Sequence, residues 1–254
     1  MTMRVTFLGT GTSQGVPLIN CNCPVCMSEN PKNKRLRCSI MVETGGKHIL
    51  IDTSMDMRQQ FLQYPFPKVD AVLFTHAHAD HIFGLDELRR FNYLQKMIIP
   101  IYGNKETIER LKVIFNYAFN GEDIKYGLPN VVENIVVGDF SIDKIPIRPI
   151  KLLHGSETVL GFRFENFAYC TDVNQIPEES FPLLEGLDVL VIAALRETRH
   201  PKHFSVEEAI AESRKIRAKK TYFTHISHIL DHEKHGSALP DGCAFAYDGL
   251  VLEL

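Results

Sequence analysis

The sequence predicts an α+β fold in which two packed β-sheets are flanked by helices. Three observations support this prediction: many short apolar runs of strand length, few segments with helical spacing, and hairpins in place of a strict alternation of strands and helices. The 254 residues are 44% hydrophobic and 23% charged, a globular composition that excludes a disordered chain, a collagen and a coiled coil. A doubly wound parallel sheet is the alternative architecture. We expect residues 1–254 to form one domain.

The predicted strands extend along the whole chain. The first is residues 5–8, and residues 39–43 and 48–51 form a hairpin joined by Gly45 and Gly46. Residues 69–75 are almost continuously apolar, which indicates a buried strand. Further strands are predicted at residues 98–102, 140–150, 159–164, 168–171, 189–193, 221–224 and 250–254.

Helical spacing of apolar residues is confined to four segments, residues 55–64, 86–93, 106–119 and 206–216. Ser205 is followed three positions later by Glu208, the pattern of a capping box. The last helix is therefore predicted to begin directly after Ser205.

The charge balance and the apolar runs restrict partners and compartment. The chain carries 28 Lys and Arg against 31 Asp and Glu, a net charge of −3, so there is no overall attraction to nucleic acid or to an anionic membrane. No apolar run approaches the roughly 18–20 residues that span a bilayer, and residues 1–9 lack the apolar region of a secretory signal. We expect a cytoplasmic protein without a membrane partner, whose six cysteines stay reduced.

The densest cluster of chemically active residues directly follows the buried strand that ends near Phe74. Residues 75–81 read Thr-His-Ala-His-Ala-Asp-His. They supply four potential metal ligands: His76, His78, Asp80 and His81. Imidazole and carboxylate are the usual ligands of zinc, manganese and iron. A polar loop with accidental histidines is the alternative, which the density of the motif disfavours.

Three further potential ligands each follow a predicted strand. They are His154, Asp172 and His225. A single histidine after a strand is more often a structural residue than a ligand. Several strand ends that deliver His or Asp to one edge of a rigid sheet predict a shared metal site.

The His-x-His-x-Asp-His run of residues 76–81, with the three later ligands, resembles the metallo-β-lactamase-fold hydrolase superfamily over essentially the whole chain. The resemblance implies an αββα sandwich with a binuclear metal site of Mn²⁺ or Zn²⁺. It implies one ion on His76, His78 and His154, a second on Asp80, His81 and His225, and Asp172 as a bridge between them. A bridging carboxylate in place of a cysteine is similar to the phosphodiesterase and nuclease branches. Asp80 would also orient the nucleophile.

A second cluster lies near the N-terminus. Cys21, Cys23 and Cys26 place three thiols within six residues, a spacing that suits a structural Zn²⁺ with tetrahedral thiolate ligation. His228 is the candidate for the fourth ligand, and a free or redox-active thiol cluster is the alternative. The other cysteines, Cys38, Cys170 and Cys243, lie in apolar runs and are predicted core residues.

The knuckle at residues 21–26 and the glycine loop at residues 9–17 together resemble the PhnP-type phosphodiesterases, which act on cyclic phosphate esters. That family has a Cys-Cys-Cys-His knuckle, which maps onto Cys21, Cys23, Cys26 and His228. The glycine loop itself is one residue too long for a dinucleotide-binding fingerprint, so a Rossmann domain is rejected.

The predicted general acid is His203, which lies two residues before the helix N-cap Ser205. In the resembling phosphodiesterases and in nucleases that process transfer-RNA 3′ ends, a histidine just before this helix protonates the leaving oxygen. His200 is the competing candidate, and a surface turn is the alternative for both.

The leading hypothesis is a binuclear metal-dependent phosphodiesterase with a small, possibly cyclic ribose, phosphodiester substrate. An RNA 3′-processing nuclease of the same fold is an alternative, but no long basic insertion is available to grip RNA. Hydrolysis of a thioester or a lactam is another, and a non-enzymatic metal-binding or redox protein is the alternative outside enzymes. The basic residues 32–37 are expected to be a solvated loop or to steer an anion. Relatives of this kind imply a possible homodimer.

Overall fold

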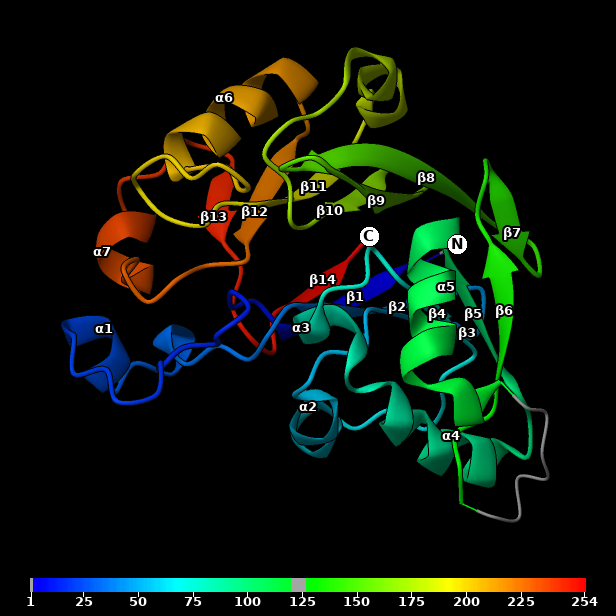
Figure 1. Cartoon of the computed structure of the whole chain (residues 1–254). Helices are drawn as coiled ribbons and strands as arrows, with labels where there is room; N and C mark the ends of the chain where they lie inside the picture. The colour runs from blue at the N-terminus through cyan, green and yellow to red at the C-terminus, as the bar shows by residue number, and fades with distance from the viewer. Residues whose placement is uncertain (1, 120–126) are drawn as a thin grey trace.

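The computed structural model describes residues 2–119 and 127–254, and within them the strands form two seven-stranded mixed sheets that pack face to face (Figure 1). The first sheet contains, in spatial order, β14 (Val251–Glu253), β1 (Arg4–Gly9), β2 (Ser39–Thr44), β3 (Lys47–Ile51), β4 (Ala71–Leu73), β5 (Ile99–Gly103) and β6 (Val131–Ile135). The second contains β13 (Cys243–Phe245), β12 (Lys220–Thr224), β11 (Val189–Ala193), β10 (Phe167–Cys170), β9 (Glu157–Phe164), β8 (Ile145–His154) and β7 (Phe140–Ile142).

The helices lie on the outer faces of the two sheets and in the loops around them. They are α1 (Pro24–Met27), α2 (Met57–Gln63), α3 (Ala79–Ile82), α4 (Leu88–Gln95), α5 (Lys105–Ile114), α6 (Val206–Ile216) and α7 (His232–Gly236), with 3₁₀ turns at Pro31–Asn33, Leu85–Glu87, Asn116–Ala118 and Glu178–Leu184. In Figure 1, α6 lies over the second sheet, while α2, α4 and α5 lie against the first.

Three separate hydrophobic layers follow from the alternation of side chains along the strands. In β3, Ile49 and Ile51 face the second sheet, whereas Leu50 faces the helices on the other side. All three are fully buried, which explains why the strand is continuously apolar from Ile49 to Ile51. The predicted αββα arrangement is confirmed, and the doubly wound single sheet is wrong, because the apolar face of each sheet is buried against the other.

Several element boundaries differ from the sequence prediction. The single strand expected at residues 140–150 is a hairpin of β7 and β8 that turns at Asp143, whose φ is 52°. Strands β6 and β13 were not predicted, since both are short sheet edges with partly exposed side chains. The helix expected at residues 106–119 ends at Ile114 and continues as a 3₁₀ turn. The capping box of Ser205 and Glu208 is confirmed.

The topology brings particular strand ends together. Strands β3 and β4 are parallel, and so are β10, β11 and β12, while β8 is separated from β10 by one antiparallel strand and therefore runs in the same direction. The carboxyl ends of these strands meet at one edge of the sandwich, where the predicted ligands lie. In the part of the chain that the structure describes, no helix is long and apolar enough to cross a bilayer.

Candidate metal centre

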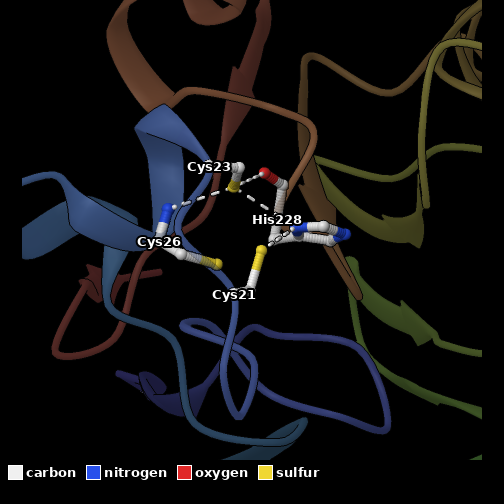
Figure 2. Close-up of side chains that lie close together, drawn as sticks. All are labelled: Cys21, Cys23, Cys26 and His228. Atoms are coloured by element: carbon white, nitrogen blue, oxygen red, sulfur yellow. Dashed lines mark hydrogen bonds between the residues drawn. The ribbon is translucent and has the colours of Figure 1, made fainter.

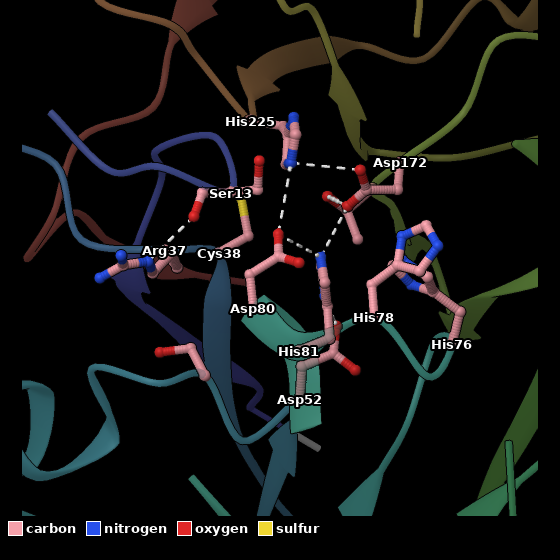
Figure 3. A network of polar contacts seen from close by, with 12 residues as sticks. Ser13, Arg37, Cys38, Asp52, His76, His78, Asp80, His81, Asp172 and His225 are labelled. Atoms are coloured by element: carbon pink, nitrogen blue, oxygen red, sulfur yellow. Dashed lines mark hydrogen bonds and ion pairs between the residues drawn. The ribbon is translucent and has the colours of Figure 1, made fainter. Parts of the chain in front are cut away.

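The predicted ligands converge at this edge from both sheets (Figure 3). The first sheet supplies its ligands from the loop after β4 and from the first turn of α3, and the second supplies them from the ends of β8, β10 and β12. Four groups at this edge have ligand atoms that all lie within 4.8 Å of one another: His76, His78 and His154; Asp80, His81 and His225; His76, His81 and Asp172; and His154, Asp172 and His203. Every residue proposed for the two active-site ions is therefore in place.

Asp172 lies between the groups. Its Oδ2 is 2.8 Å from Nε2 of His81, and its Oδ1 is 3.1 Å from Nε2 of His225. The carboxylate is almost completely buried and comes from the turn after β10. The ligand atoms of Asp172 also lie within 4.8 Å of those of His76 and of His154, so the carboxylate is within reach of both ligand groups, as a bridging ligand requires.

The imidazoles are oriented by partners behind them. Nδ1 of His81 donates to Oδ2 of Asp52 over 2.7 Å, and the hydroxyl of Thr75 donates to the same oxygen over 2.8 Å. Because the hydroxyl proton of Thr75 is used in this way, its oxygen accepts from Nδ1 of His76, 3.0 Å away. Both rings consequently hold their proton on Nδ1 and turn Nε2 toward the cluster.

His154 is oriented in the same manner, since its Nδ1 donates to the main-chain oxygen of Lys202 over 2.8 Å. The buried Nε2 of His76 has no hydrogen-bond partner among the described residues. An unpaired buried nitrogen costs free energy unless another group satisfies it. A divalent cation would satisfy these Nε2 atoms and the adjacent carboxylates together, so the residues present fit the metal pair that the superfamily implies.

The backbone is strained at this edge. Asp52, Asp172 and His225 each follow a strand, and each adopts a positive φ, of 63°, 47° and 58° respectively. Non-glycine residues rarely adopt this conformation, because it is higher in free energy, and it occurs mainly at functional sites. The surrounding sheets therefore hold these three side chains in place against a local preference for other conformations.

Burial and mutual attraction shift the titration of the cluster. Although burial opposes ionisation, the imidazoles of His225 and His81 hold the pKa of Asp172 well below its usual range. Burial alone would lower the pKa of His81, but the carboxylates of Asp80, Asp52 and Asp172 raise it well above its usual value. The carboxylates thus favour positive charge at His81, and a divalent cation bound through its Nε2 would supply that charge.

His203 belongs to the cluster and His200 lies outside it. The ring of His203 stacks on that of His225 at 4.8 Å with an interplanar angle of 17°, and its Nδ1 is 3.4 Å from Oδ1 of Asp172. His200 instead accepts a hydrogen bond from the main-chain N–H of Lys202. Of the two candidates for the general acid, only His203 faces the metal ligands. Burial and the neighbouring His225 lower the pKa of His203 to about 3.

Sequence reasoning missed Asp52 and Thr75, which orient two of the imidazoles. A signal was available, because Asp52 directly follows the apolar Leu50 and Ile51, the same pattern of apolar run and acid that identified Asp172. Asp52 was not singled out because it has no second ligand-type residue beside it.

The cysteine knuckle forms a second cluster, apart from the first (Figure 2). The ligand atoms of Cys21, Cys23, Cys26 and His228 all lie within 4.8 Å of one another. Nδ1 of His228 is 3.5 Å from the sulfur of Cys21 and 3.3 Å from that of Cys23. Although burial opposes it, the N–H of Cys26 and the ring of His228 lower the pKa of Cys23 to about 6, which favours the thiolate that a zinc ion binds.

The remaining cysteines and the glycine loop are structural. Cys38 and Cys170 are buried, and burial raises the pKa of each thiol to about 12, while Cys243 is half-buried at the second core. A side chain on Gly9 would place its Cβ 2.0 Å from the main-chain oxygen of Arg37, so the loop can pass this segment only as glycine.

The basic segment at residues 32–37 is solvated only in part: Lys34 is exposed, whereas the two arginines are held by the protein. Arg35 is 2% exposed and donates to the hydroxyl of Thr10 and to the main-chain oxygen of Ala246. Arg37 pairs with Asp56 at 2.7 Å. These arginines fix the N-terminal loop, so their charge is not available to steer a ligand.

Comparison with known proteins agrees with this architecture. The family model described as Beta-lactamase superfamily domain matches residues 47–226. The chain belongs to the metallo-β-lactamase superfamily. The chain also superposes over its whole length on a solved diphosphatase of the PhnP family, with a TM-score of 0.93, 40% identity and 98% of that chain covered.

Two other relatives are more distant or longer. The octanoyltransferase of Porphyromonas gingivalis is 35% identical over 253 residues, which cover 98% of this hydrolase and 51% of that protein. The hydrolase therefore spans about half the length of this curated relative. Zn²⁺-bound PqqB from Methylobacterium extorquens shares the fold, with a TM-score of 0.79, 21% identity and 100% of its chain covered.

The position of Asp172 between the groups generates a first prediction. Asp172→Ala removes both bridging oxygens and leaves each proposed ion short of a ligand, so we expect loss of active-site metal and of turnover. Elemental analysis of the purified variant beside an activity assay checks this. Retention of two active-site ions with normal rates would show that Asp172 is not a bridge.

The knuckle generates a second prediction. The knuckle links the N-terminal segment to the loop that carries His225, and these are far apart in the sequence. A zinc ion bound there would therefore stabilise the fold by joining two distant segments, which lowers the conformational entropy of the unfolded chain. Cys23→Ser should cost one zinc per chain and lower the melting temperature, by about 2–4 °C for each kcal/mol lost in a protein of this size. Activity should fall only indirectly. Full zinc content with an unchanged melting temperature would contradict the assignment.

Proposed function

We propose that this hydrolase is a binuclear metal-dependent phosphodiesterase that acts on a small phosphodiester, with a cyclic ribose phosphate as one candidate. The observation that carries the proposal is the position of Asp172, which lies close to His81 and His225 of one ligand group and within 4.8 Å of ligand atoms of His76 and His154 of the other. Two adjacent ligand groups that share a carboxylate suit two divalent cations side by side, the arrangement used in hydrolysis of phosphate esters.

The residues have distinct roles in this proposal. His76, His78 and His154 would hold one cation, Asp80, His81 and His225 the other, and Asp172 would contact both. Two Mn²⁺ or Zn²⁺ ions bound there would polarise the phosphoryl oxygens and lower the pKa of water toward neutrality. The protein supplies rigid orientation, because Asp52, Thr75 and the main chain of Lys202 fix the imidazoles from behind.

His203 is the residue best placed to assist the leaving group. It lies beside Asp172 and His225, on the segment before α6. Because its pKa is about 3 in the protein alone, the ring is neutral at pH 7 and carries one N–H that can donate a hydrogen bond to a ligand. An anionic phosphate beside the ring favours the imidazolium and so raises its capacity to protonate the leaving oxygen. Asp80 would orient the attacking nucleophile.

The relatives support chemistry at phosphorus. The solved PhnP-family relative, 40% identical, is described as a diphosphatase. A ribonuclease Z of Bradyrhizobium diazoefficiens is 28% identical over 170 residues, 64% of this chain and half of that protein. Both names denote cleavage of a bond between phosphorus and oxygen. The nuclease alternative is weaker here, since the net charge of −3 offers no broad surface for RNA.

A second candidate is hydrolysis of an acyl ester or thioester. It is favoured by the octanoyltransferase relative, which aligns with nearly the whole chain. The same metal pair can polarise a carbonyl oxygen. Because the match covers only half of that protein, the acyl chemistry can belong to its other half.

One set of assays separates these candidates. Metal-loaded protein is given bis(p-nitrophenyl) phosphate, a 3′-extended transfer RNA and an octanoyl thioester, with Asp172→Ala as the matched control. We expect turnover of the phosphodiester that is lost in the variant. Turnover of the thioester or of the RNA alone would overturn the proposal in favour of that alternative.

The proposed role of His203 predicts a dependence on the leaving group. His203→Ala should keep the metals and lower the rate by ~10²–10⁴-fold on an alkyl diester, whose alkoxide needs a proton. The loss should be much smaller on a p-nitrophenyl diester, because nitrophenolate leaves without protonation. Steady-state rates on the two substrates check this. An equal loss on both, or the same selective pattern in His200→Ala, would contradict the role.

We also propose that the protein works in the cytoplasm. All six cysteines are free thiols, and the clustered knuckle thiols require a reducing compartment to remain zinc ligands.

A further inference from the structure

Two residues outside the proposed ligand set, Glu157 and Lys202, contact the group formed by His76, His78 and His154, called here the three-histidine group. Glu157 is the first residue of β9, and its Oε2 lies 3.3 Å from Nε2 of His78. Its other oxygen lies 3.6 Å from the ammonium of Lys202. Glu157 therefore sits between a proposed ligand and a lysine of the segment that precedes α6.

This contact decides which nitrogen of His78 is available to a metal. A neutral imidazole carries one proton, and a carboxylate beside Nε2 favours the tautomer with the proton on that atom. The lone pair then lies on Nδ1. His78 would bind through Nδ1, whereas His76 and His154 have their protons on Nδ1 and present Nε2.

Lys202 also contacts the three-histidine group directly, through its main chain. Its main-chain oxygen accepts from Nδ1 of His154 over 2.8 Å, and its aliphatic chain packs on Gly155, where an added Cβ would be 3.1 Å from Cγ of the lysine. Lys202 is thus tied to His154 through its backbone and to His78 through Glu157. It is also the residue before His203.

We propose that Glu157 and Lys202 are positioning residues that preorganise the three-histidine group for its metal ion and couple that ion to the segment that carries His203. A carboxylate behind an imidazole fixes the ring and increases its basicity as a ligand. Because Lys202 directly precedes His203, a metal ion bound by the three histidines would order this segment. Conversely, disorder in the segment would lower the affinity of the three histidines for the metal.

The strength of these contacts depends on how far the side chains are exposed to water. The side chains of Glu157 and Lys202 are 50% and 46% exposed, so water weakens their mutual pairing. The Glu157–His78 contact is also open to water, with His78 38% exposed, but it is shorter, at 3.3 Å against 3.6 Å. Loss of an outer partner of a metal-binding histidine costs about 10–100-fold in metal affinity.

Cobalt binding tests the proposal without reference to any substrate. Protein stripped of active-site metal is titrated with Co²⁺ against a competing chelator, and the visible absorption reports the histidine and carboxylate sites. The thiolate-to-cobalt charge-transfer band reports the knuckle separately. We expect Glu157→Gln to weaken one of the two active-site binding steps about 10-fold and Glu157→Ala up to about 100-fold, with the other step and the knuckle unchanged.

Matched variants separate this role from a general effect on folding. Glu106 lines the same cavity of about 460 Å³ as His78 and Glu157, so Glu106→Gln removes an equal charge and should leave Co²⁺ affinity unchanged. Lys202→Met should weaken the same step less than Glu157→Gln, and Lys202→Arg should restore it. Equal affinities for Glu157→Gln and Glu106→Gln would overturn the proposal. A loss spread over both steps, together with a lower melting temperature of the metal-free protein, would also overturn it in favour of a merely structural role.

Discussion

The structure depends on one electrostatic constraint: buried carboxylates and imidazoles must share positive charge at the edge where the two sheets meet. Asp52 and Asp172 are withdrawn from water, and an isolated carboxylate in that position is very unfavourable. In this structure the imidazoles beside these carboxylates provide part of the compensation. A pair of divalent cations would provide it more completely, and the outer nitrogens of His76, His81 and His154 are already held by partners behind them.

The sandwich supplies the rigidity for this. Side chains alternate between the core between the sheets and the helix-facing cores, so each strand is held on both faces up to its carboxyl end. This packing on both faces holds Asp52, Asp172 and His225 in positive-φ conformations. The knuckle contacts His228, which lies three residues after the proposed ligand His225. The segment before α6 contacts His154 through the main chain of Lys202 and Asp172 through His203. The proposed ligands are therefore connected to both segments.

The sequence predicted the ligands better than the elements that hold them. His76 to His81 and the later His154, Asp172 and His225 follow apolar runs, and parallel strand ends meet for geometric reasons, so their convergence could be anticipated. The turn at Asp143 and the edge strands β6 and β13 could not, because short, half-exposed strands have no distinctive periodicity. Asp52 and Glu157 were also missed. Asp52 follows an apolar run as Asp172 does, but its partner His81 is distant in the sequence, and the partner of Glu157, His78, is distant as well, so the local pattern does not indicate their roles.

The most direct test of the account is an anomalous-scattering map from a crystal of the metal-loaded hydrolase. The account predicts two peaks about 3.5–4 Å apart on either side of Asp172, and a separate zinc peak among Cys21, Cys23, Cys26 and His228. A single peak at the cluster, or two peaks of which Asp172 touches only one, would contradict the claim that a shared buried carboxylate organises a binuclear centre.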